Sequence, residues 1–213
     1  MNQRLKLNVL LAASVIFALI MVLVRVYLSG TLSYTFLLWN LFLAAVPFGL
    51  SSFLIYSKNV PTTLFWLTTG CWLLFFPNAP YVLTDLLHLR PFMVPVWYDL
   101  LMLLSFAWTS LMIGFVSLSD MQGLIVQRFN QFAGWLFVGV ALGLGSFGIY
   151  LGRFLRWNSW DILTEPRRLL NDILEPLINP LSNINTHGFT MLLTAFLALA
   201  YLTLQFFQGQ KSK

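Results

Sequence analysis

Long uncharged runs are the feature that most constrains the fold of this chain. Residues 7–24 contain no charged side chain, and further apolar stretches of similar length follow. A helix needs about 20 apolar residues to cross the ~30 Å hydrocarbon core of a bilayer. Only 9% of the residues are charged, against about 25% in soluble domains, so most of the surface must face lipid. The sequence therefore predicts an all-α fold class, a polytopic membrane helix bundle, in a single integral membrane domain over residues 1–213.

We expect about six transmembrane helices and one interfacial amphipathic helix. The first run is interpreted as a retained span, because the apolar core of a secretory signal has about 7–15 residues and ends at a cleavage site flanked by small residues. Over residues 165–178 leucines and isoleucines repeat at helical spacing, with charged side chains on the other face, which is typical of a helix lying flat in the membrane surface. The predicted spans are residues 7–28, 32–56, 62–81, 96–118, 132–151 and 188–207.

The third span contains a break. It begins near Thr62 and reaches Pro77 after fifteen residues, which at about 1.5 Å per residue is roughly 22 Å and short of the hydrocarbon thickness. Irregular backbone at membrane depth is tolerated only where protein or a water-filled cavity surrounds it. We therefore expect the Pro-Asn-Ala-Pro sequence at residues 77–80 to lie within the membrane or at its edge, near one face.

Two polar clusters should emerge on the same membrane face of a six-span protein. Ionisable groups near membrane depth are costly, so they usually pair with one another or line a wet site. We predict that the two clusters form one ligand-binding site. The first cluster contributes Asn78, Tyr81, Asp85, His88 and Asp99, and the second contributes Arg153, Arg156, Asn158 and Asp161.

Three residues of the first cluster are candidate catalytic groups. Asp85 and His88 are three positions apart, on one face if a helix begins at Thr84, and such a pair could share a proton or a metal ion, for which a third ligand such as Asp99 would be needed. The alternative is structural, with Asp85 capping a short helix, His88 among lipid headgroups and Asp99 complementing its helix dipole. One cysteine and two histidines exclude most metal centres, so no metal site is expected.

The arginines of the second cluster favour an anionic ligand. Arg153 and Arg156 lie at the end of a helix, and their planar guanidinium groups suit carboxylate or phosphate. An anionic lipid headgroup or a small metabolite is the preferred ligand; the alternative is that both arginines pair with acidic side chains. No nucleotide-binding or hydrolase motif is present, no cofactor is indicated, and no run of Lys or Arg indicates nucleic acid.

The fifth span is rich in glycine and could contact another helix closely. Gly139 and Gly143, and likewise Gly148 and Gly152, are four positions apart, which places small residues on one face. Either this helix is central in the bundle or it forms a contact in a homo-oligomer.

The distribution of charge favours cytoplasmic termini. A six-span protein has both termini on one side, and the twelve basic residues then divide equally between the two sides, so the positive-inside rule does not decide. Six of the seven acidic residues would lie on the side opposite the termini, where they offset the basic residues of that side.

Two motifs carry a resemblance to a known family. Residues 76–81 (Phe-Pro-Asn-Ala-Pro-Tyr) with Thr84, Asp85 and His88, and residues 148–161, resemble an uncharacterised family of bacterial integral membrane proteins, the domain of unknown function number 1361. The resemblance extends over roughly residues 35–205. It implies a multi-pass protein of a bacterial cell membrane, and it implies no activity, substrate or cofactor.

The function predicted from the sequence is that of a multi-pass membrane protein with a polar ligand- or headgroup-binding cluster at one membrane face. One alternative is a membrane enzyme acting on a lipid or envelope substrate, with Asp85 and His88 as an acid–base pair. Another is a structural or assembly subunit of a membrane complex, in which the polar cluster only fastens helices together.

Overall fold

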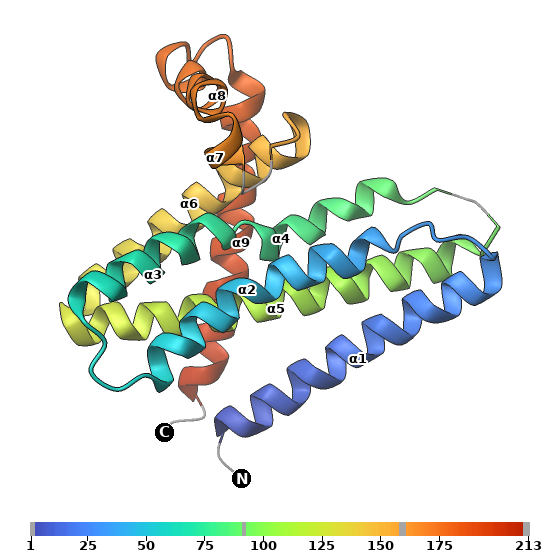
Figure 1. Ribbon diagram of the computed structural model, residues 1–213, viewed down its shortest axis with the longest axis horizontal. Coiled ribbons are helices and arrows are strands. Elements are labelled where there is room, and N and C mark those ends of the chain that lie inside the picture. The colour runs from blue at the N-terminus through green and yellow to red at the C-terminus, as the bar shows by residue number, and fades with distance from the viewer. Residues whose placement is uncertain (1–2, 91–92, 158–160, 211–213) are drawn as a thin grey trace. The chain divides into compact units, whose positions relative to one another are not determined.

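The computed structural model describes residues 3–90, 93–157 and 161–210, and the regular elements in those ranges are helices (Figure 1). Within them, five helices are long and apolar enough to cross a membrane: α1 (Gln3–Ser29), α2 (Phe36–Tyr56), α5 (Val96–Arg128), α6 (Gln131–Phe154) and α9 (Ile184–Gln210). The predicted all-α, polytopic helix bundle is therefore confirmed.

The chain divides into two compact units, residues 1–120 and 121–213, each described by itself. The prediction of a single membrane domain stays a prediction.

The segment predicted as the third span is divided into three short elements. α3 (Thr62–Phe75) has 14 residues and is followed by α4 (Asn78–Tyr81) and the 3-10 helix η1 (Val82–His88). A continuous span over residues 62–81 is therefore not formed, and the helix ends just before Pro77, where the sequence predicts the break. Asn78 Nδ2 donates to the carbonyl oxygen of Phe75 at 2.9 Å, which satisfies one of the carbonyls that a helix end leaves without an intrahelical donor.

α5 is ten residues longer than the predicted span over residues 96–118, since it continues to Arg128. The sequence predicts a connection over residues 119–128 because hydropathy falls there. The helix nevertheless continues through these residues. The actual connection is Phe129 and Asn130. The side chain of Asn130 accepts a hydrogen bond from Ala133 N at 2.8 Å, so this residue caps the start of α6.

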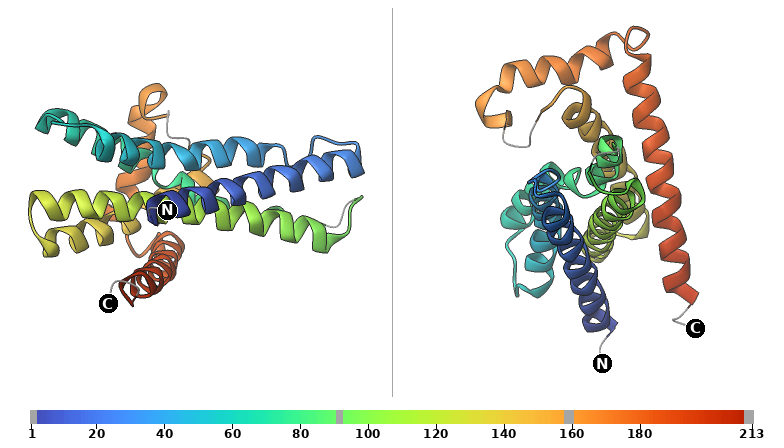
Figure 2. Two further views of the ribbon diagram at one scale, coloured as in Figure 1. Left: turned by 90° about the horizontal axis from the view of Figure 1, so that it is seen from below. Right: turned by 90° about the vertical axis from the view of Figure 1, so that its right-hand side faces the viewer.

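In unit 1, α1, α2 and α5 run side by side and α3 and α4 pack against α2 (Figures 1 and 2). The segment formed by α3 and α4 also contacts α5. Trp72 stacks on Phe76 with ring centroids 4.6 Å apart and donates to Ser117 Oγ at 2.5 Å. A Cβ added to Gly114 of α5 would lie 2.7 Å from the Cβ of Ala79. Gly114 thus permits the close approach of α4 to α5.

In unit 2, α6 packs against α9. Tyr201 of α9 donates to Gln122 Oε1 at 2.7 Å and accepts from Gln205 Nε2 at 2.7 Å. A Cβ added to Gly139 or Gly143 of α6 would have no atom of the described residues within 4 Å. Among the described residues, no other helix therefore approaches α6 closely at these two glycines. The homo-oligomer contact stays a prediction.

The predicted interfacial helix is present as α8 (Pro166–Ile178), which follows the short α7 (Asp161–Thr164). Pro166 occupies the first turn, where its missing N–H removes no helical hydrogen bond. Within unit 2, α8 runs crosswise to α9 (Figure 2). His187 Nε2 of α9 lies 3.0 Å from the carbonyl oxygen of Pro176, so the two helices are in direct contact.

Candidate functional site

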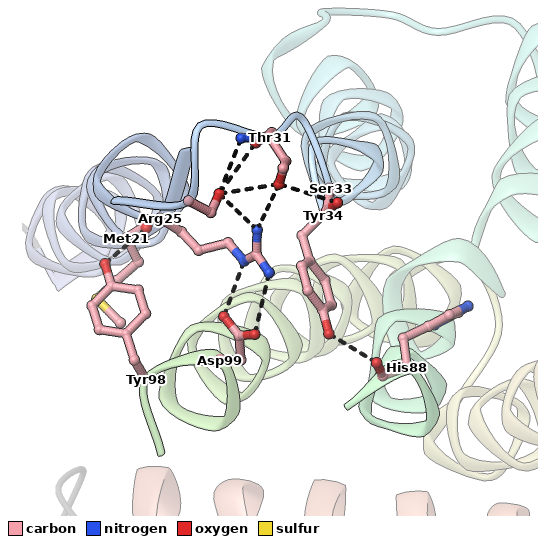
Figure 3. Close-up of polar contacts among 9 residues, drawn as sticks. Met21, Arg25, Thr31, Ser33, Tyr34, His88, Tyr98 and Asp99 are labelled. Carbon is pink, nitrogen blue, oxygen red and sulfur yellow. Dashed lines mark hydrogen bonds and ion pairs between the residues drawn. The ribbon is translucent and has the colours of Figure 1, made fainter. Parts of the chain in front are cut away.

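Arg25 and Asp99 form a fully buried ion pair at one end of unit 1 (Figure 3). Arg25 lies near the end of α1 and Asp99 in the first turn of α5. Arg25 Nε donates to Asp99 Oδ1 at 3.0 Å, and Nη2 donates to Oδ2 at 3.4 Å. Both side chains are 0% exposed. Because a buried charge is tolerated only when it is paired and hydrogen-bonded, this contact fixes α1 against α5.

The α1–α2 loop completes the surroundings of Arg25. Its Nη1 donates to Ser29 Oγ at 3.1 Å and to Thr31 Oγ1 at 3.3 Å. The ring of Tyr34 lies 4.6 Å from the guanidinium carbon, and the Tyr34 hydroxyl donates to the carbonyl oxygen of His88 at 2.8 Å (Figure 3). Tyr34 has a φ of 71°, a left-handed conformation that bulky residues rarely adopt. Tyr34 therefore joins the ion pair to η1.

Asp85 and His88 lie one turn apart on η1. His88 Nδ1 is 3.8 Å from Asp85 Oδ1, and Asn40 Nδ2 donates to Asp85 Oδ2 at 2.8 Å. The Asp85 side chain is 1% exposed and that of His88 is 46% exposed. The ring of Phe36 packs on the imidazole with centroids 5.2 Å apart. The result is a buried carboxylate beside an accessible imidazole.

A second ion pair lies at the other end of α1 and α5. Both terminal nitrogens of Arg4 contact Asp120, with Nη2 2.6 Å from Oδ2, and Ser51 Oγ donates to Oδ2 at 3.3 Å. From Arg4 to Arg25, and from Asp99 to Asp120, the separation is 21 positions. At 1.5 Å per residue this is roughly 32 Å, close to the ~30 Å hydrocarbon core. Along α1 and α5 the two ion pairs are thus separated by about the thickness of the hydrocarbon core, and Lys6 is the one charged residue between them.

The arginine cluster belongs to unit 2. Arg153 lies in the last turn of α6 and is partly exposed, and Arg156 follows the helix and is exposed. Arg156 has a φ of 63°, which is uncommon for a residue with a side chain. Asp161 is the first residue of α7, and Asn158 lies outside the described residues.

Contacts with the preceding residues Trp157 and Glu165 hold α8 in place within unit 2. Trp157, just after α6, donates from Nε1 to Asp172 Oδ2 at 2.8 Å. The guanidinium carbon of Arg168 lies 5.6 Å from the Trp157 ring, and its Nη1 is 3.3 Å from Glu165 Oε2. These contacts engage one side of α8. The apolar side chains of Leu170, Leu174 and Ile178 recur every four residues and are exposed, so α8 presents an apolar row to its surroundings.

The predicted site residues therefore separate into several environments. Asp85 and His88 come together, whereas Asp99 pairs with Arg25 and Asn78 bonds to the backbone of α3. Tyr81 ends α4 and is partly exposed. The 77–99 and 153–161 segments fall in different units, and a site shared by the two stays a prediction.

Sequence reasoning missed the partners of the acidic residues. From the sequence alone, Arg4, Arg25 and Asp120 enter only the balance of charge between the two sides, and no role is expected for Asn40 or Tyr34. One signal was available, because Arg4 and Arg25 share their 21-residue separation with Asp99 and Asp120. Asn40 had no such signal, since its contact with Asp85 depends on how α2 packs against η1.

Comparisons with known proteins identify a family and no function. Neither the search of curated proteins nor the search of solved structures gave a match. A family model described as "Protein of unknown function (DUF1361)" matches residues 39–200, which is well over half of the 213-residue chain and includes both motifs singled out above. This chain therefore belongs to the DUF1361 family of proteins of unknown function.

Proposed function

We propose that this protein is a multi-pass protein of a cell membrane that binds anionic lipid headgroups at one membrane face through the arginines of residues 153–168. The observation that carries the proposal is α8. It runs crosswise to the apolar helix α9 (Figure 2) and exposes Leu170, Leu174 and Ile178 on one side. A helix with one apolar and one charged side lies in the membrane interface with its apolar side among the acyl chains.

Exposed cations lie before α8 and in its first turn. Arg156 and Arg167 are exposed, and among the described residues neither side chain forms an ion pair or hydrogen bond. Guanidinium groups bind phosphate oxygens through a planar set of donors, and each basic residue near an anionic surface adds about 1 kcal/mol of attraction. A helix held at headgroup depth would keep both arginines within reach of lipid phosphates.

The two ion pairs of unit 1 support a transmembrane placement of that unit. They are roughly 32 Å apart along α1 and α5, and the residues between them are uncharged apart from Lys6, so each pair would lie near one membrane surface. With six crossings, six of the seven acidic residues would lie on the side opposite the termini, which favours cytoplasmic termini and residues 153–168 at the outer face.

Replacing Arg156 and Arg167 together by glutamine is expected to weaken binding of phosphatidylglycerol about 30-fold, which corresponds to about 2 kcal/mol for two charges. Native mass spectrometry of the purified protein, titrated with phosphatidylglycerol and with zwitterionic phosphatidylcholine, measures the bound lipid directly. The matched control replaces Lys6 and Lys58, two exposed cations of unit 1, by glutamine and should leave the affinity nearly unchanged. Equal lipid retention by both double variants would refute the proposal.

A further inference from the structure

The Asp85–His88 pair has a geometry that headgroup binding by unit 2 does not use. The Asp85 carboxylate is buried, and Asn40 donates to one of its oxygens at 2.8 Å. The other oxygen lies 3.8 Å from His88 Nδ1, which is longer than a hydrogen bond. In enzymes without bound substrate, catalytic hydrogen bonds are often long and shorten in the substrate complex. A buried carboxylate that faces Nδ1 favours the tautomer with the proton on Nδ1, which leaves Nε2 able to accept a proton.

Two further contacts fix the orientation of the histidine. The Phe36 ring packs on the imidazole at 5.2 Å, and the backbone carbonyl of His88 accepts from the Tyr34 hydroxyl at 2.8 Å. Tyr34 is itself held against the buried Arg25. The His88 ring projects away from the Arg25–Asp99 pair (Figure 3) and is 46% exposed. A solvent-accessible imidazole with a fixed backbone and a buried carboxylate beside it has the arrangement of a general base and its positioning residue.

We propose that His88 is a general base, positioned by Asp85, that acts on an ester of a membrane-borne amphiphile. The substrate class follows from the surroundings of His88. Phe36 packs on the imidazole and is 40% exposed, and the adjacent residue Leu87 is 69% exposed, so exposed apolar side chains near His88 would accept an acyl chain. This site lies in unit 1 and is independent of the headgroup site proposed in unit 2.

The reaction is hydrolysis, with water as the co-reactant. His88 Nε2 takes a proton from water as the water oxygen forms a bond to the ester carbonyl carbon, and the carbonyl electron pair moves onto its oxygen. When that pair returns, the bond between the carbonyl carbon and the alkoxy oxygen breaks. The leaving oxygen takes the proton back from Nε2, so the products are a carboxylic acid and an alcohol, and the imidazole is again neutral.

The test uses the full chain in nanodiscs with p-nitrophenyl decanoate as the probe. Replacing His88 by glutamine should lower the hydrolysis rate at least 100-fold, the lower range for a general base, and Asp85→Asn should lower kcat about tenfold with KM nearly unchanged. The matched control is His187→Gln, which removes the other histidine of the chain and should leave the rate unchanged. A wild-type rate no higher than that of His88→Gln overturns the proposal.

A second readout keeps the proposal testable if Asp85→Asn fails to fold. Nitrogen-15 NMR of histidine-labelled wild-type protein in mildly alkaline buffer reports which ring nitrogen carries the proton, and His187→Gln assigns the two signals. The proposal predicts the proton on Nδ1 of His88. A proton on Nε2 contradicts it, because Nε2 could then not accept a proton from water.

Discussion

Replacing Asp99 with asparagine is expected to lower the free energy of unfolding by about 3–5 kcal/mol, the usual cost of removing one partner of a buried ion pair. The reason is that Arg25 would remain 0% exposed without the carboxylate that neutralises it, and its contacts with Ser29 and Thr31 supply no negative charge. The measurement is the fraction of protein that remains monodisperse in size-exclusion chromatography after heating in detergent, together with the yield from membranes.

Two controls separate charge burial from general damage. Glu175→Gln removes a carboxylate from the exposed side of α8 and should change stability by less than about 0.5 kcal/mol. The double variant Arg25→Met with Asp99→Leu removes both charges and should recover most of the loss, since apolar pairs often replace buried ion pairs without cost. If Asp99→Asn is as stable as Glu175→Gln, the Arg25–Asp99 pair does not fasten α1 to α5.

Replacing Gly114 with valine is expected to destabilise unit 1 by about 1–3 kcal/mol, the usual cost of overpacking. An added Cβ would lie 2.7 Å from the Cβ of Ala79 and 4.0 Å from its Cα, so α4 would have to move away from α5. That movement should also disturb the stacking of Trp72 on Phe76. Thermal stability in detergent gives the energetic change, and the emission of the buried Trp72 should shift if the segment loosens.

The matched control for this substitution lies in the same helix. Gly123 of α5 has no atom within 4 Å of an added Cβ, so Gly123→Val introduces the same side chain into open space and should be tolerated. Equal stability of the two valine variants would mean that α4 does not pack tightly on α5 at Gly114.

The elements that could be predicted from sequence depend on local chemistry. The end of α3 follows from Pro77, and the amphipathic α8 follows from the repeat of leucine and isoleucine. The end of α5 was predicted at residue 118, because hydropathy reports where lipid contact ends, whereas the helix ends where Asn130 caps α6. Local signals therefore locate the breaks and fail where a helix continues beyond the apolar run.

The candidate site was predicted only in part, for a related reason. Asp85 and His88 are close in sequence, so their proximity on η1 could be anticipated. The shared 21-residue separation was the one signal for the partner of Asp99, because Arg25 lies 74 positions away and the pairing itself depends on how α1 packs against α5. The Tyr34 hydroxyl contacts His88, and the Tyr34 backbone is left-handed. The conformational preference of tyrosine does not predict that backbone.

The most direct test of this account is the sidedness of two positions in unit 1. Cys71, the single cysteine, is first replaced by serine. A cysteine is then placed either at position 58, in the loop after α2, or at position 90, just after η1. Lys58 and Arg90, which occupy these positions, are both exposed. Ser51 of α2 contacts Asp120, whereas η1 contacts Tyr34 beside Arg25, so the two loops belong to opposite ends of the unit. A membrane-impermeant maleimide added to intact cells should label the cysteine at position 90 and should label the one at position 58 only after permeabilisation. Labelling of both positions from the same side would contradict the placement of the two ion pairs at opposite membrane faces.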